Sequence, residues 1–182
     1  MRPGKEDRHE RQAIGVVVFG AASIVLAVAS ASEARPTAGI DPNVVHVFAP
    51  RGGPGANCTR VYGLARRVKK PAVLTGAMRA LVAGPTASER ARGYGGWFST
   101  KTAGSVTGVR ISRHVAYIDF RDFSRSIPNA SSSCGSTLLL AQLDRTALQF
   151  PAVARTVYSF NGNRRAFYDW LQRSVPPSPT RR

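Results

Sequence analysis

The sequence lacks the clusters of residues that most catalytic and metal-binding sites require. It has 3 histidines, and His46 and His114 stand apart in a predicted strand and a predicted turn. An isolated histidine in such a place is more typically packed or solvated than a base. Asp119 and Asp122 are too few to enclose a cation. We therefore expect a protein without enzyme activity, cofactor or metal ion.

A small secreted hydrolase is the alternative to that expectation, and one segment favours it. Residues Ser99–Gly104 loosely resemble the Lys-Thr-Gly element of penicillin-binding enzymes. That class also needs a serine followed by a lysine three residues later. No serine in this sequence meets the condition, so the hydrolase alternative lacks its nucleophile.

Acidic residues are also scarce, and the charge is strongly one-sided. The 182 residues include 26 Lys and Arg but only 10 Asp and Glu, which gives a formal net charge of +16. Such an excess favours polyanionic partners, namely nucleic acid, anionic lipid head groups or acidic cell-wall polymers. The alternative is a soluble, arginine-rich surface with no specific partner. Hydrophobic residues make up 43% of the chain, which is enough to form a core.

A single long apolar run lies near the N-terminus and predicts the compartment. Basic residues precede an uncharged run from Ala13 to Ala29, and Ala27–Ala29 and Ala29–Ala31 both fit the pattern that a signal peptidase cleaves. We expect residues 1–31 to be a signal peptide, or a membrane anchor if residues 13–31 stay attached. The remainder would then lie outside the cytoplasm, secreted or tethered. An exported protein meets no genome, so we expect no nucleic-acid partner.

Cysteine is the other scarce residue, because Cys58 and Cys134 are the only two. Neither lies near the apolar run, which excludes a lipid-modified cysteine there. An even pair in an exported chain predicts a disulfide, and two free thiols are the alternative. A catalytic cysteine is not supported, because the sequence pairs no histidine with either residue.

The segment before Gly84 is the clearest helix in the sequence. Its apolar residues recur at i, i+3, i+4, i+7 and i+8, which predicts one buried stripe. Gly84 suits the left-handed position that ends a helix, and Pro85 prevents its continuation. The stripe consists of Leu74, Ala77, Met78, Leu81 and Val82.

Strand patterns occur on both sides of this helix. Val44–Phe48 and Thr59–Val68 precede it, and Thr156–Phe160 lies near the end of the chain. The strongest sheet signal is Val106–Phe123, which we interpret as a hairpin that turns at Arg113 and His114. That turn places Ile111 opposite Ala116 and Val109 opposite Ile118, so that four apolar side chains share one face and Arg110 and Tyr117 share the other.

A second helix is expected from Thr137 to Gln149, after a serine-rich segment and before Pro151. Phe167, Tyr168, Trp170 and Leu171 then suggest a short aromatic helix end, followed by a basic, proline-rich tail. The expected buried face of the second helix consists of Ser136, Leu140, Leu143, Ala147 and Phe150.

Two groups of basic residues are candidate binding sites. One lies at the end of the second predicted strand, and the other precedes the aromatic residues near the C-terminus. Basic residues beside aromatic ones suit an anionic polymer or a membrane surface. The alternative is a solvated strand end and a helix that docks on the sheet. The first group is Arg66, Arg67, Lys69 and Lys70, and the second is Arg164 and Arg165.

Three segments together resemble the signatures of the GerMN domain, a module named for a spore-germination protein. They are Ala80–Thr86, Val115–Phe120 and Gln142–Gly162. The resemblance implies an α+β domain similar to the ring-building modules of sporulation and secretion machinery. It implies a small sheet of about four or five strands with two helices packed on one face.

The resemblance also implies a non-catalytic role in the bacterial cell envelope, in sporulation or germination. The expected partner is an envelope protein, an anionic cell-wall polymer or lipid, or a second copy of the chain in a homo-oligomer. Arg113 and His114 replace the acidic-glycine turn often found in the family hairpin, so Arg113 makes that tip basic and joins the candidate binding residues. The expected plan is a signal or anchor at 1–31, a linker at 32–43, the domain at 44–166, and the aromatic helix end and tail at 167–182.

Overall fold

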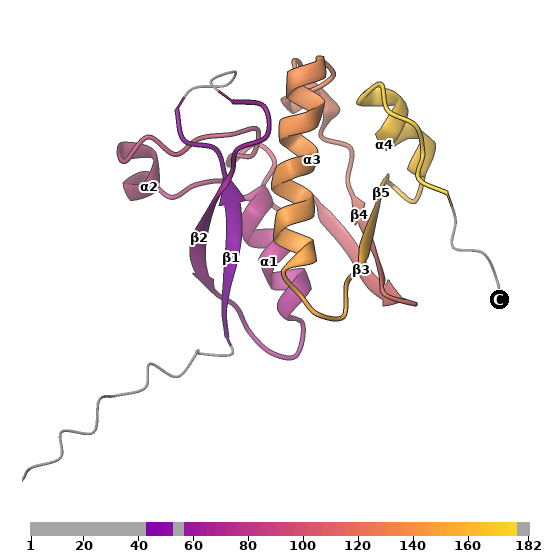
Figure 1. Cartoon of the computed structure of the whole chain (residues 1–182), viewed down its shortest axis with the longest axis horizontal. Helices are drawn as coiled ribbons and strands as arrows, with labels where there is room; N and C mark the ends of the chain where they lie inside the picture. Colours follow the sequence, from indigo (N-terminus) through magenta and orange to yellow (C-terminus); the bar gives the residue numbers. More distant parts are fainter. Residues whose placement is uncertain (1–42, 53–56, 178–182) are drawn as a thin grey trace, which may run out of the picture. The chain divides into compact units, whose positions relative to one another are not determined.

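In the computed structural model, residues 43–52 and 57–177 are described, and within them two small sheets flank two helices (Figure 1). Helices α1 and α3 contact each other, and each contacts one strand of either sheet. Helix α4 packs on the last strand. The elements are β1 (Val44–Ala49), β2 (Tyr62–Arg67), α1 (Val73–Val82), α2 (Ala87–Ala91), β3 (Val106–Ser112), β4 (Val115–Phe120), a 3₁₀ turn (Ser124–Ser126), α3 (Ser133–Leu148), β5 (Arg155–Phe160) and α4 (Arg164–Trp170).

The α+β class is confirmed, but the five strands form two sheets instead of the single sheet expected. Strands β1 and β2 pair antiparallel, and β3, β4 and β5 form a separate sheet in that order. The reason is that polar side chains of α3 occupy the free edge of β1. The Gln149 side chain hydrogen-bonds both the N–H and the C=O of His46, at 2.9 and 2.7 Å. Thr146 accepts a bond from Phe48 N–H, and Gln142 donates to Phe48 C=O.

Helix α1 buries the expected stripe and ends as expected. All five apolar residues of the stripe are buried. Gly84 follows with φ of 77°, in the left-handed region, and Phe98 C=O approaches so closely that any Cβ there would clash. The chain then turns directly into α2, which the sequence patterns did not predict. Thr86 and Glu89 form a capping box at its start.

The hairpin of the second sheet has the predicted register and turn. Ile111 lies opposite Ala116 and Val109 opposite Ile118. Arg113 and His114 both have positive φ, 50° and 58°, as a two-residue hairpin turn requires. Strand β5 adds in parallel to β4. Because the two strands run the same way, β5 ends at the opposite end of the sheet from the hairpin tip.

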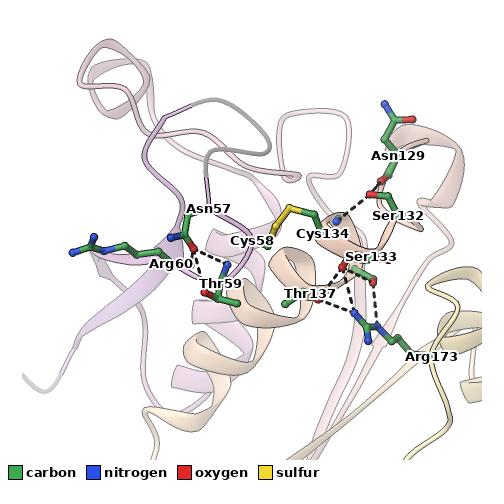
Figure 2. Close-up of a disulfide and its surroundings, with 12 residues drawn as sticks. Asn57, Cys58, Thr59, Arg60, Asn129, Ser132, Ser133, Cys134, Thr137 and Arg173 are labelled. Carbon is green, nitrogen blue, oxygen red and sulfur yellow. Dashed lines mark hydrogen bonds between the residues drawn. A yellow bond between two sulfur atoms is a disulfide. The ribbon is translucent and has the colours of Figure 1, made fainter.

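Helix α3 begins at Ser133, one turn before the expected start, and Ser132 caps it. The early start places Cys134 in the first turn, where it forms the predicted disulfide with Cys58 (Figure 2). Its buried face differs from the prediction. Leu140 and Phe150 are only half-buried, whereas Leu139, Gln142 and Thr146 are fully buried.

Helix α4 belongs to the packed core, which extends past residue 166. Phe167 and Leu171 are fully buried, and the Phe167 ring contacts the rings of Phe120 and Phe160. The predicted signal segment, the linker up to residue 42 and the last residues of the tail lie outside the described residues. None of the helices within residues 43–52 and 57–177 has the length and apolar character needed to cross a membrane.

Candidate functional site

An apolar groove lies where the start of α1 meets β3 and the loop after α3. It has a volume of about 470 Å³ and is lined by residues 71–75, Val109, Ile111 and residues 150–152. Ile111 is 42% exposed, which is unusual for a large hydrophobic side chain opposite a fully buried Ala116. The sequence predicted the pairing but not this exposure, because the helix that should cover Ile111 begins beside it and leaves a gap.

Basic residues flank this groove, and we call them the basic rim. Lys69 and Lys70 are exposed and directly precede Pro71 on one side. Arg113 is exposed at the hairpin tip, two residues beyond Ile111. The end of β2, the start of α1 and the hairpin tip all lie at the lower end of Figure 1. Among the described residues that line the groove, none is acidic. Arg67 ends β2 on the same side and is exposed.

Arg66 does not join the basic rim, although the sequence grouped it there. Its guanidinium forms two hydrogen bonds of 2.6 Å with the Glu89 carboxylate. The Arg66 hydrogen bond is the main reason that the pKa of Glu89 falls to about 2, against the opposing effect of burial. Glu89 is only 6% exposed, so Arg66 serves to neutralise a buried carboxylate.

Arg164 and Arg165 lie at the start of α4, at the opposite end of the second sheet from Arg113. The Arg164 guanidinium carbon stands 5.1 Å from the ring centre of Tyr117, and that of Arg110 stands 4.3 Å from the same ring. Both contacts are within the range of cation–π attraction. The structure therefore divides the predicted basic residues between two separate places, and the second includes Arg110.

A pocket with charged and hydroxyl groups in its lining, which the sequence patterns did not indicate, lies between α3, β5 and the segment after α4. This α3–β5 pocket has a volume of about 540 Å³. Burial, and then the nearby Asp144 charge, raise the pKa of Tyr158 well above its usual value. Burial likewise raises the pKa of Tyr168 to about 12. Both phenols are therefore protonated near neutral pH. The lining residues are Thr137, Leu140, Ala141, Asp144, Thr156, Tyr158, Tyr168, Arg173, Ser174 and Pro176.

The alternating positions of β5 were the only sequence signal for this pocket. Thr156 and Tyr158 point from one face of the strand toward Asp144 of α3, which lies at i+7 from Thr137. A polar stripe on a mostly apolar helix is weak evidence for a pocket unless the strand that faces it is known. The sequence alone therefore could not identify this pocket.

Asp119, considered above only as a possible cation ligand, is held by hydrogen bonds from the protein itself. It accepts hydrogen bonds from Ser159 Oγ, Thr107 Oγ1 and the Gly162 N–H, at 2.6 to 2.7 Å. Burial opposes ionisation, but these bonds outweigh it and lower the pKa of Asp119. Within residues 43–52 and 57–177, His, Cys, Asp and Glu form no group that could hold a metal ion.

Comparison with known proteins identifies the family. A family model described as Germane, sporulation and spore germination, matches residues 48–165. The first GerMN domain of the sporulation protein GerM from Bacillus subtilis is 14% identical, and the match covers 66% of this chain and 84% of that one with a TM-score of 0.45. Among curated proteins no match is found. Because the family model spans well over half of the 182 residues, the chain belongs to the Germane, or GerMN, family of sporulation and spore germination.

Proposed function

We propose that this chain is a non-catalytic interaction module of the cell envelope, and that its apolar groove binds an acidic segment of a partner protein. The observation that carries the proposal is the groove itself, with Ile111 42% exposed at its floor and no acidic residue in its lining. An exposed apolar surface with a charged border is typical of a protein-binding site. The basic rim of Lys69, Lys70 and Arg113 favours a partner that carries carboxylates.

The disulfide supports a location outside the cytoplasm. Cys58 and Cys134 are bonded, and disulfides form and persist in oxidising compartments. The predicted signal at residues 1–31 agrees with this location. Membership of a sporulation and germination family supports an envelope role and is consistent with a protein that does not act as a catalyst.

The test is the retention of the segment from Pro36 to Arg182 on isolated envelope, at low and at high salt. A partner protein predicts retention that survives high salt, because buried apolar contacts are not screened. The same retention should disappear once envelope proteins are stripped. Lys70→Gln combined with Arg113→Gln should slow association, whereas Arg125→Gln, an exposed arginine outside the groove lining, should not.

A second candidate function is favoured by the net charge of +16. In that case the chain is a basic anchor for anionic cell-wall polymer or lipid head groups. Retention would then fall steeply with salt and would persist after envelope proteins are stripped. A third outcome, in which the purified segment self-associates and Ile111→Glu makes it monomeric, would identify a second copy as the occupant of the groove.

A further inference from the structure

One end of the α3–β5 pocket is negative. The Oδ1 atom of Asp144 accepts hydrogen bonds from Thr156 Oγ1 and Tyr158 OH, both at 2.7 Å. These two hydroxyl groups fix the orientation of the carboxylate. The second oxygen, Oδ2, makes no hydrogen bond within the described part of the chain. No arginine or lysine of residues 43–52 and 57–177 forms an ion pair with Asp144. Among the described residues, the pocket thus presents an oriented carboxylate oxygen that forms no ion pair.

The other end of the pocket is positive. Figure 2 shows the Arg173 guanidinium held against the first turns of α3. Its Nε donates to Ser136 Oγ at 3.1 Å, and its Nη2 donates to Thr137 Oγ1 at 2.7 Å and to Ser133 C=O at 3.3 Å. Arginine has five N–H donors, so these three bonds leave both donors of Nη1 for a ligand. The two free N–H groups of Nη1 diverge, so Nη1 can donate one charge-assisted hydrogen bond to a carboxylate oxygen while the guanidinium charge attracts the anion.

The two charged ends are separated by a floor of small and apolar side chains. Thr137, Leu140, Ala141 and Asp144 occupy positions i, i+3, i+4 and i+7 on one face of α3. Seven residues of α-helix advance about 10 Å along the axis. A peptide of three residues in extended conformation also spans about 10 Å between its ends. The face of α3 between the two charged ends therefore has about the length of a short extended peptide, and each end carries the charge opposite to one peptide terminus.

We propose that the α3–β5 pocket binds a short extended peptide by both ends, with its amino group at Asp144 and its carboxylate at Arg173. The volume of about 540 Å³ lies within the usual range for small-molecule sites. A simple anion would use Arg173 alone and a simple cation Asp144 alone. The juxtaposition of both charges across an uncharged floor favours a ligand that carries both. The proposal does not depend on the groove, whose lining residues are different.

The test uses trialanine as the probe and calorimetry on the full chain. Trialanine should bind saturably, and both N-acetyl-trialanine and trialanine amide should bind at least about tenfold more weakly, because each cap removes one charged hydrogen-bonding end. Absence of saturable trialanine binding would overturn the proposal. So would equal binding of the capped and uncapped forms, or a loss caused by only one of the two caps.

Two variants connect each end of the peptide to its residue. Asp144→Asn keeps an oxygen that accepts from Thr156 and Tyr158, so the fold should survive and its melting temperature provides the check. It should weaken the binding of trialanine at least about tenfold but leave the affinity for N-acetyl-trialanine unchanged. Arg173→Gln should weaken the binding of trialanine and leave the affinity for trialanine amide unchanged. An equal loss for capped and uncapped peptide in either variant would contradict the assignment.

Matched controls lie outside the pocket. Asp169→Asn and Arg165→Gln remove the same charges from exposed positions of α4 and should leave trialanine binding intact. Ala141→Leu keeps both charges and fills the floor, so it should abolish binding of trialanine. If Ala141→Leu bound trialanine as well as the unaltered chain, the peptide would not occupy the pocket.

Discussion

At the scale of single residues, Glu89 connects the first sheet to the turn after α1. Its carboxylate accepts a hydrogen bond of 2.8 Å from the Thr86 N–H, which completes the cap of α2. The same carboxylate pairs with Arg66 of β2 at 2.6 Å. Removing one partner of such a buried pair leaves the other charge uncompensated, so either single substitution is expected to destabilise the fold.

We predict that Glu89→Gln destabilises the protein by about 2 kcal/mol at neutral pH. Glutamine can still accept the hydrogen bond that caps α2, so the loss of stability reports mainly on the ion pair with Arg66. The folded pKa of about 2 lies below the ordinary value of 4.5, so the carboxylate stabilises the fold above pH 4.5 and this contribution is lost as the pH falls toward 2. Urea unfolding at several pH values should show the difference shrinking over that interval. A difference that stays constant down to pH 2 would contradict this account.

Gly84 is the residue at which backbone conformation decides stability. Its φ of 77° disfavours any side chain, and a Cβ would lie 2.4 Å from Phe98 C=O. We predict that Gly84→Ala destabilises the protein by at least about 2 kcal/mol. Gly104 has a similar φ of 73° but open space around it, so Gly104→Ala should cost only about 1 kcal/mol. Equal losses in thermal unfolding would show that the Phe98 contact has no role.

At the scale of elements, α3 has an apolar face that packs in the core and a polar face that hydrogen-bonds β1, and no single periodicity in the sequence predicts both. Leu139 and Leu143 pack in the core, while Gln142, Thr146 and Gln149 hydrogen-bond the edge of β1. Polar residues on a helix usually indicate a solvated face. Here the unpaired backbone of a neighbouring strand gives these side chains hydrogen-bond partners, and Gln142 and Thr146 are buried against it. This explains why the helix was predictable from the sequence but its buried face and the division into two sheets were not.

Gln142 tests the role of this polar stripe. It is 1% exposed, donates to Phe48 C=O and accepts from the Trp97 N–H. Gln142→Leu would leave both partly buried backbone groups without this partner, so we predict a loss of about 2–4 kcal/mol. Gln149→Leu should cost less, because its bonds to His46 lie where water can replace them. Chemical unfolding of both variants gives the comparison, and the reverse order would contradict the role of the stripe.

The disulfide joins the loop before β2 to the first turn of α3. Cys58 and Cys134 are 76 residues apart, and closing a loop of this length stabilises the fold by up to about 4.5 kcal/mol in the chain-entropy model. We predict that the double variant Cys58→Ser, Cys134→Ser loses a large part of this stability. A reductant should destabilise the unaltered chain and leave the double variant unchanged. If the unaltered chain kept its stability in reductant, the disulfide would have no structural role.

At the scale of the whole molecule, the sequence supported the family and the main elements better than the site. Helix α1, the hairpin register and the Cys58–Cys134 bond each follow from local patterns or from a count. The groove depends on how the start of α1 meets β3, and the α3–β5 pocket depends on residues from three distant elements. Such sites arise from tertiary packing, which hydrophobic periodicity does not report. Charge alone grouped Arg66 with Lys70, although Arg66 has a buried partner.

The most direct test of the proposed function is the effect of one charge in the groove on retention by isolated envelope. Ile111→Glu places a carboxylate at the exposed apolar floor, and Val175→Glu makes the same change at a side chain that is 39% exposed outside the groove. We predict that Ile111→Glu reduces retention at high salt at least about tenfold, whereas Val175→Glu retains the affinity of the unaltered segment. Equal retention of the two variants would contradict the assignment of the groove as the binding surface.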